Sequence, residues 1–152
     1  MDRSQAAARL MCAVDTTDLT QAKGLAQRLD GHVGGLKLGL EFFCAHGPSG
    51  VRDVVGQKHG LFLDLKLHDI PNTVAGGLLG AALMKPFLTT IHASGGAAMM
   101  RAAMETVETF GSQRPKVVAV TMLTSMDDTD LQSVGMHTPV SDQVMRLAEL
   151  AQ

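Results

Sequence analysis

Three charged residues, Asp64, Lys66 and Asp69, stand at the end of an otherwise apolar stretch, residues 61–73 (LFLDLKLHDIPNT). Because side chains alternate across a β-strand, Asp64 and Lys66 are expected on one face and the leucines between and around them on the other. A lysine placed between carboxylates stays protonated, since nearby opposite charges favour its charged form. Such a fixed ammonium group can stabilise negative charge that develops in a transition state.

A simpler explanation also fits these residues: Lys66 neutralises Asp64, and Asp69 or Asn72 caps the next helix. The proline in this stretch has no amide proton and favours an extended residue before it. The strand is therefore expected to end by His68 and a helix to begin near Asn72. Asp69 then lies in the strand-to-helix loop.

Apolar segments with β character alternate with helix-like segments along the chain, as a parallel βαβ series requires. The expected strands are residues 10–15, 33–39, 61–67, 87–93 and 117–124. The expected helices are residues 19–29, 42–57 with an interruption at Gly47-Pro48, 73–84, 97–110 and 142–152. The pattern predicts an α/β fold without linkers or low-complexity segments.

Each expected strand is apolar at its start and polar at its carboxyl end. The polar groups, in chain order, are Asp15, Lys37, the Asp64 and Lys66 pair, His92, and Thr124 with Ser125. In a (β/α) barrel the active site forms at that edge, from several strands at once. The convergence of five strands carries more weight than any one of these residues.

Several of these residues also have a structural explanation. Asp15 could end its strand or cap a helix, and Lys37 could be a surface lysine whose stem lies along its leucine neighbours. A lone histidine such as His92 is more often a satisfied core residue than a catalyst. Thr124 and Ser125 could be turn or cap residues of the acidic segment that follows, itself expected to begin a solvated helix.

Composition indicates an ordinary globular domain: 152 residues, 45% hydrophobic and 18% charged, with a formal net charge of -2. Neither nucleic acid nor a membrane is indicated as a partner. The opening residues MDRSQAAARL lack a signal-peptide core, and no apolar run approaches the roughly 20 residues that span a bilayer. We expect a cytoplasmic protein in which Cys12 and Cys44 are reduced.

The string DLKLHDIPNT at residues 64–73 resembles the signature of the orotidine 5′-phosphate decarboxylase family. The segments AVD, GLKLGLEFF, FLDLKLHDIPNTV, TIHASGG and VAVTMLTSM also follow in that family's order, so the resemblance covers essentially the whole chain. It implies a TIM-type (β/α)8 barrel, a homodimer, and decarboxylation of orotidine 5′-phosphate to uridine 5′-phosphate in pyrimidine synthesis. It also implies that no metal or other cofactor takes part.

By position, the resemblance assigns the chemistry to Asp64 and Lys66, beside the reacting C6 carbon of the pyrimidine. Lys66 would also protonate that carbon after carbon dioxide leaves, while Asp64 would repel the departing carboxylate. Asp69, with Thr73 beside it, would reach the ribose in the partner subunit's site. Dimerisation would thus complete each active site.

The remaining substrate-binding residues follow from the same comparison of positions. Asp15 and Lys37 would bind ribose hydroxyls, and Lys37 would also join the charged network. Thr124 and Ser125 would lie near the pyrimidine.

A second enzyme class shares the Asp-x-Lys-x-x-Asp spacing: metal-dependent sugar-phosphate decarboxylases and aldolases of the same barrel superfamily. These enzymes bind magnesium with a carboxylate at the end of the second strand. Lys37 stands at that position here and would repel a divalent cation.

A complete eight-unit barrel needs roughly 200 to 250 residues, so residues 1–152 are expected to form the amino-terminal portion of one barrel domain, about its first five β/α units. The family's phosphate-binding arginine and closing loop belong to the later units. We therefore expect a truncated version of a longer protein, catalytically weak or inactive by itself. Its unpaired sheet edge and exposed apolar lining predict aggregation or swapped association.

Overall fold

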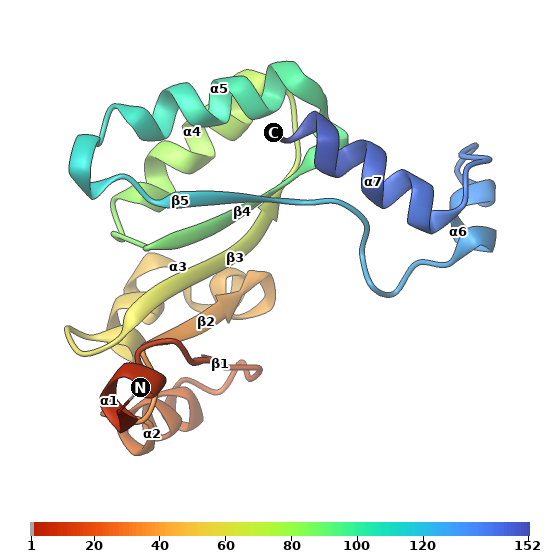
Figure 1. The fold of residues 1–152 in the computed structure, drawn as a ribbon. Helices are drawn as coiled ribbons and strands as arrows, with labels where there is room; N and C mark the ends of the chain where they lie inside the picture. The colour runs from red at the N-terminus through yellow and green to blue at the C-terminus, as the bar shows by residue number, and fades with distance from the viewer. Residues whose placement is uncertain (1) are drawn as a thin grey trace.

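Parallel strands follow one another across a single sheet in the order in which they occur in the chain (Figure 1). The computed structural model describes residues 2–152. Its strands are β1 (Met11–Ala13), β2 (Gly35–Gly39), β3 (Gly60–Leu67), β4 (Leu88–His92) and β5 (Lys116–Val120). Each strand pairs in parallel with the one before it, which confirms the expected βαβ series.

A helix follows each of the first four strands. These helices are α2 (Leu19–Arg28), α3 (Leu40–Val55), α4 (Pro71–Ala82) and α5 (Gly96–Glu108). A short helix α1 (Arg3–Ala7), which the sequence did not predict, precedes β1. Helices α6 (Asp128–Ser133) and α7 (Val140–Leu150) follow β5. Two 3-10 turns are η1 (Ala93–Gly95) and η2 (Gly111–Gln113). The expected interruption of α3 is confirmed, because Gly47 leaves the helical region with φ 59° and Pro48 follows it.

Four of the five strands are shorter than predicted, and the difference is largest for the first and the last. The strand expected at 117–124 ends at Val120, because the register pairs Val120 with His92, the last residue of β4. The residues after Val120 therefore have no neighbouring strand on that side. The strand expected at 10–15 is confined to β1, although the amide of Val14 still donates to the carbonyl of Lys37 at 3.0 Å.

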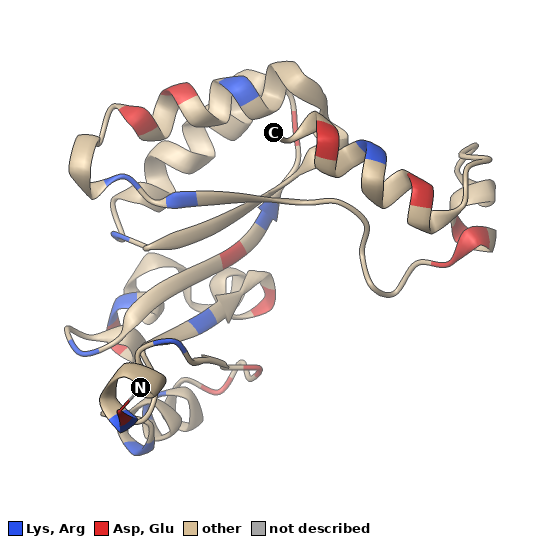
Figure 2. Ribbon diagram, in the orientation of Figure 1, with Lys and Arg blue, Asp and Glu red and all other residues tan. Residues whose placement is uncertain are grey.

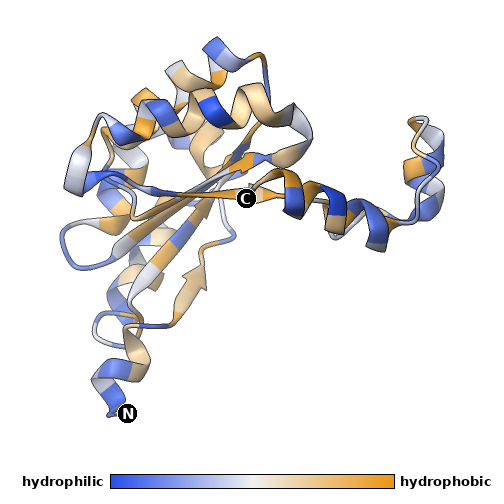
Figure 3. Cartoon of the chain, turned by 45° about the horizontal axis from the view of Figure 1, so that its top comes forward, coloured by the Kyte–Doolittle hydropathy of each residue, from blue (hydrophilic) through white to orange (hydrophobic). Residues whose placement is uncertain are grey.

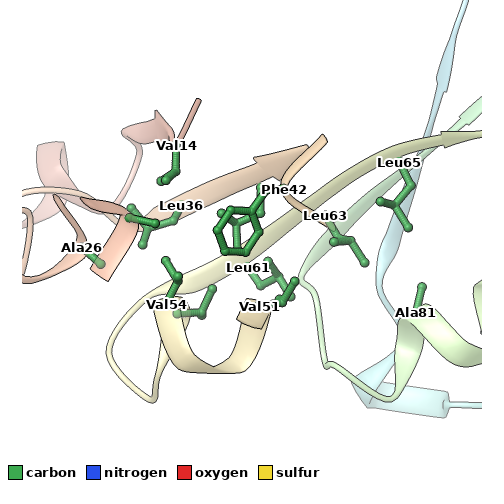
Figure 4. Packing of buried hydrophobic residues seen from close by; sticks show 13 residues of the cluster. Val14, Ala26, Leu36, Phe42, Val51, Val54, Leu61, Leu63, Leu65 and Ala81 are labelled. Carbon is green, nitrogen blue, oxygen red and sulfur yellow. The ribbon is translucent and has the colours of Figure 1, made fainter. Parts of the chain in front are cut away.

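Two clusters of buried side chains hold the helices against the sheet. The first lies between β1–β3 and helices α2 and α3, where Leu36, Val54 and Leu61 lie around Phe42 in Figure 4; Leu65 and Ala81 of the same cluster lie farther from Phe42. The second joins α4 and α5 to β4. Leu67, the last residue of β3, contacts both clusters, so the end of β3 lies where they meet.

The leucines of β2 and β3 belong to the first cluster and face its helices; Leu36, Leu38 and Leu63 are fully buried. Alternation along the strands therefore directs Lys37 and Asp64 to the opposite face of the sheet. The prediction that leucines and charged residues occupy different faces is confirmed.

The two outer strands of the sheet each have one strand neighbour within residues 2–152. Met11 on β1 is 39% exposed and Val118 on β5 is 46% exposed, as expected for a sheet that is not closed. Beyond β5 the chain leaves the sheet, and α6 with the start of α7 projects from it in both views (Figures 1 and 3). Within the described residues, no helix has both the length and the apolar character of a membrane span.

Gly34 is expected to tolerate no side chain. A Cβ atom there would lie 2.3 Å from the carbonyl oxygen of Ala8, and backbone cannot move aside as a flexible side chain can. We expect Gly34→Ala to lower the free energy of unfolding by roughly 1–3 kcal/mol, measured by urea denaturation. The matched control is Gly24→Ala in α2, where the nearest atom lies 3.7 Å away; it should stabilise the protein by about 0.5–1 kcal/mol. Equal stability of Gly34→Ala and the parent protein would contradict the prediction.

Candidate active site

Lys37 on β2 and Asp64 and Lys66 on β3 form one ionic group, which we call the ionic triad. Lys66 Nζ donates a hydrogen bond to Asp64 Oδ2 at 2.9 Å, and Lys37 Nζ lies 3.5 Å from the same oxygen. Figure 2 shows blue and red bands on the adjacent strands β2 and β3. The expected pairing of Asp64 with Lys66 is confirmed. The sequence predicted a lysine between carboxylates, whereas the described chain has a carboxylate between two lysines.

Asp64 is the most buried member of the triad. Its side chain is 10% exposed, against 30% for Lys37 and 38% for Lys66. Burial raises the pKa of the Asp64 carboxyl, but hydrogen bonds from Lys66 and Thr90 and the charges of both lysines outweigh it, so the pKa lies below its ordinary value. Asp64 is thus an anion at neutral pH, and the triad presents a net positive charge.

A β-bulge places Lys66 at this position. Leu63 pairs with Thr89 and Leu67 with Ile91, so residues 64–66 face the single residue Thr90 on β4. Lys66 has a φ of 50°, in the left-handed region that residues with a Cβ adopt at a cost of roughly 1–2 kcal/mol. Strained backbone of this kind is often found where a side chain must take a particular direction.

Thr90 is the site residue that sequence reasoning missed. Its side-chain oxygen donates to Asp64 Oδ1 at 2.9 Å and accepts from the amide of Lys66 at 2.9 Å, and the residue is 3% exposed. A signal was available: a threonine inside an apolar strand needs a hydrogen-bond partner, and alternation places Thr90 on the same face as His92.

His92 ends β4 beside the triad. Its ring lies 5.4 Å, centre to centre, from that of His68, which follows β3. Burial lowers the pKa of His92, and the nearby charges of His68 and Lys66 lower it further. His92 is half-buried, so the sequence-based preference for a core histidine fits only in part.

Asp15 lies two residues beyond β1 and is exposed, in a shallow hollow that it shares with Glu41 and Phe42. It is not a helix cap, because Asp18 caps α2 by accepting the amide of Gln21 at 2.9 Å. No ion pair or hydrogen bond joins Asp15 to the triad in the described chain.

Asp69 lies in the loop before α4, as predicted, and Thr73 lies in the first turn of that helix; both are exposed. The Asp69 carboxylate accepts the amide of Ile70 at 2.6 Å. No side chain caps α4, so the capping role considered for Asp69 or Asn72 is wrong. No hydrogen bond or ion pair joins Asp69 or Thr73 to the triad within residues 2–152.

Thr124 and Ser125 lie in a turn between β5 and α6, and both are exposed. The strand ends before them, so they are not at its carboxyl end as expected. Asp127 caps α6 through the amide of Asp130, which confirms the acidic helix start. Hydrogen bonds and ion pairs thus join three of the predicted site residues. Within residues 2–152 none joins the triad to the other five, which are Asp15, Asp69, Thr73, Thr124 and Ser125.

Metal-binding side chains do not gather at this edge: across residues 2–152, no group of three or more His, Cys, Asp or Glu side chains is placed to hold an ion. The site instead holds two ammonium groups, those of Lys37 and Lys66, beside the buried carboxylate of Asp64. Such a group can bind an anion and can stabilise negative charge that forms on a substrate.

Comparisons with known proteins point to one family of enzymes. A family model described as "Orotidine 5'-phosphate decarboxylase / HUMPS family" matches residues 8–152. The orotidine 5'-phosphate decarboxylase of Paramagnetospirillum magneticum is 54% identical over 144 residues, which cover 92% of this chain and 61% of the relative. That of Novosphingobium aromaticivorans is 53% identical over 140 residues, with the same two coverages.

A solved structure has the same fold. The crystal structure of orotidine 5'-phosphate decarboxylase from Lactobacillus acidophilus matches with a TM-score of 0.84 at 35% identity, covering 93% of this chain and 66% of that one. The chain spans about 61% of the length of the two curated relatives named above. Its five parallel strands are part of a TIM-type barrel, as predicted.

His92 is expected to take up a proton only below its ordinary pKa of 6.5, because burial and two cationic neighbours disfavour its charge. The unfolded chain binds this proton at higher pH, so the stability that His92 contributes is complete above about pH 6.5 and is lost as the pH falls below it. An NMR titration of the ring resonances measures the midpoint. Lys66→Met and His68→Gln should each raise it, and His32→Gln should not; a parent midpoint at or above 6.5 would contradict the prediction.

Proposed function

Because the chain belongs to the orotidine 5′-phosphate decarboxylase / HUMPS family, we propose that it carries the decarboxylating residues of an orotidine 5′-phosphate decarboxylase. The reaction converts orotidine 5′-phosphate to uridine 5′-phosphate in pyrimidine synthesis. The observation that carries the proposal is the ionic triad, with Lys66 Nζ 2.9 Å from Asp64 Oδ2 at the edge of parallel strands where barrel enzymes bind substrates.

The reaction needs a fixed positive charge. When the bond between C6 and the carboxylate breaks, its electron pair stays on C6 in an orbital in the plane of the ring, which the π system cannot delocalise. The Lys66 ammonium stabilises that charge and then gives C6 a proton, forming the new C–H bond; solvent restores the proton to Lys66. Carbon dioxide leaves without a cofactor.

Asp64 and Lys37 prepare the site for this step. Asp64 fixes the position of the Lys66 ammonium and faces the substrate carboxylate, which it repels before the bond breaks. Lys37 lies 3.5 Å from Asp64, so it helps keep Asp64 ionised and extends the positive charge toward the ribose hydroxyls, which it would bind together with Asp15. Thr124 and Ser125 would bind near the pyrimidine.

We place the remaining residues, Asp69 and Thr73, in the active site of a second copy of the chain. They are exposed, and α4 carries an apolar face beside them: residues 76, 79, 80 and 83 repeat at helical spacing. Leu79 is 51% and Leu83 72% exposed, and open space surrounds the two glycines of this face. A contiguous apolar face of this kind supports a homodimer with shared active sites.

Binding of the substrate phosphate and the location of the protein in the cell also belong to the proposal. Contacts to the substrate phosphate, remote from C6, normally help orient the reacting group, and none of the residues assigned above binds the phosphate. Residues 1–152 by themselves are therefore expected to react weakly. A cytoplasmic location is part of the proposal, since phosphorylated nucleotides are retained there.

Lys66→Ala is expected to reduce decarboxylation at least about a thousandfold, because the charge at C6 and its proton donor are both lost. Conversion of orotidine 5′-phosphate is followed by chromatography, and binding of uridine 5′-phosphate by calorimetry should persist in part. The matched control is Lys58→Ala, which removes a lysine paired with Asp30 and leaves the triad intact.

Near-normal turnover by Lys66→Ala would overturn the role given to this lysine. The assay is repeated with a chelator of divalent cations. Loss of parent activity under chelation would favour a metal-dependent sugar-phosphate enzyme instead, and unchanged activity would support the proposal.

Mixing inactive Lys66→Ala and Asp69→Ala subunits should restore activity if the site is shared. A mixed dimer then has one site with an intact Lys66 and an intact Asp69, so equal mixing should give about one quarter of parent activity. Subunit exchange is checked by native mass spectrometry with one variant isotope-labelled. No recovery despite exchange would show that Asp69 does not serve the neighbouring site.

A further inference from the structure

We infer that Thr90 is a positioning residue for the decarboxylation proposed above, through its contacts with both Asp64 and Lys66. The inference rests on that proposed function for its catalytic consequence. The contacts themselves, and their effect on the ionic triad, are independent of the substrate.

The direction of both hydrogen bonds at Thr90 follows from the groups involved. The Lys66 amide can only donate, so the Thr90 oxygen accepts from it at 2.9 Å. The hydroxyl proton is therefore free to go to Asp64 Oδ1, also at 2.9 Å. A single hydroxyl thus joins the buried carboxylate to the backbone of the lysine that it pairs with.

The contact with Asp64 fixes the plane of its carboxylate. Oδ1 is held by Thr90 on β4, while Oδ2 faces Lys66 on β3 and Lys37 on β2. Without Thr90 the carboxylate could rotate about its last bond, and its distance to Lys66 Nζ would vary. A small displacement of a catalytic group is sufficient to slow a reaction substantially.

The contact with Lys66 supports its left-handed backbone. At the bulge, residues 64–66 face only Thr90, so the Lys66 amide bonds to the threonine side chain instead of a backbone carbonyl on β4. An unpaired amide at this half-buried position would add to the cost of φ 50°. Thr90 therefore stabilises the backbone conformation that directs Lys66 to Asp64.

Thr89 provides a matched control within the same strand. It is fully buried, and its hydroxyl donates to the carbonyl of Leu63 at 3.0 Å. Alternation directs it to the opposite face of the sheet, away from the triad. Valine has nearly the shape of threonine, so each replacement removes one buried hydroxyl and little else. Only the Thr90 hydroxyl bonds to Asp64 and Lys66.

The test compares Thr90→Val, Thr90→Ser and Thr89→Val in the full-length gene product. Titration of the Asp64 carboxyl carbon by NMR needs no substrate: Thr90→Val should raise the midpoint, since a hydrogen bond to the charged form is lost, and Thr90→Ser should restore it. In the decarboxylation assay Thr90→Val should lower kcat roughly 10- to 100-fold with little change in KM, and Thr90→Ser should recover most of the loss. Thr89→Val should change neither the midpoint nor kcat.

Unchanged Asp64 titration and unchanged kcat in Thr90→Val would overturn the inference. So would equal losses in Thr89→Val, because they would reduce the effect to general destabilisation of the sheet. Absence of decarboxylation in the parent protein would instead overturn the proposed function. The Asp64 titration would then still decide whether Thr90 positions the triad.

Discussion

The carboxylate of Asp64 is the constraint on which the rest of the site depends. A charge that is 10% exposed destabilises a protein unless neighbouring groups compensate it. Here three adjacent strands each contribute one partner: Lys37 from β2, Lys66 from β3 and Thr90 from β4. The alignment of these strands therefore compensates the charge of one buried carboxylate. The buried side chains that pack helices behind the strands hold that alignment in place.

The bulge in β3 links this charge to the backbone. Regular pairing would continue the ladder with β4, whereas the observed register lets Lys66 adopt a left-handed conformation beside Thr90. Leu67 follows directly and packs into both core clusters, which fixes the strand on the far side of the bulge. The irregular segment is therefore held by the buried Leu63 at one end and by the partly buried Leu67 at the other.

Patterns local in sequence predicted much of this structure. Apolar segments with β character predicted the five strands, and Gly47-Pro48 predicted the break in α3. The two-residue spacing of Asp64 and Lys66 predicted their contact. The remaining features depend on partners distant in the chain. The length of β5 is limited by where β4 ends, and Thr90 acquires its role only because a bulge on another strand brings two polar groups to it. Asp69 and Thr73 make no hydrogen bond or ion pair with the ionic triad within residues 2–152, so local sequence patterns give them no contact there.

The strand order has a consequence for how the protein is made. Since each strand pairs with its predecessor, every partner of Asp64 lies on β2, β3 or β4, and all of them are synthesised before β5. A chain leaving the ribosome can assemble the ionic triad and its contact with Thr90 by successive pairings of neighbouring strands, without waiting for β5. The partners of Asp64 are thus all present in the chain before β5 is added to the sheet.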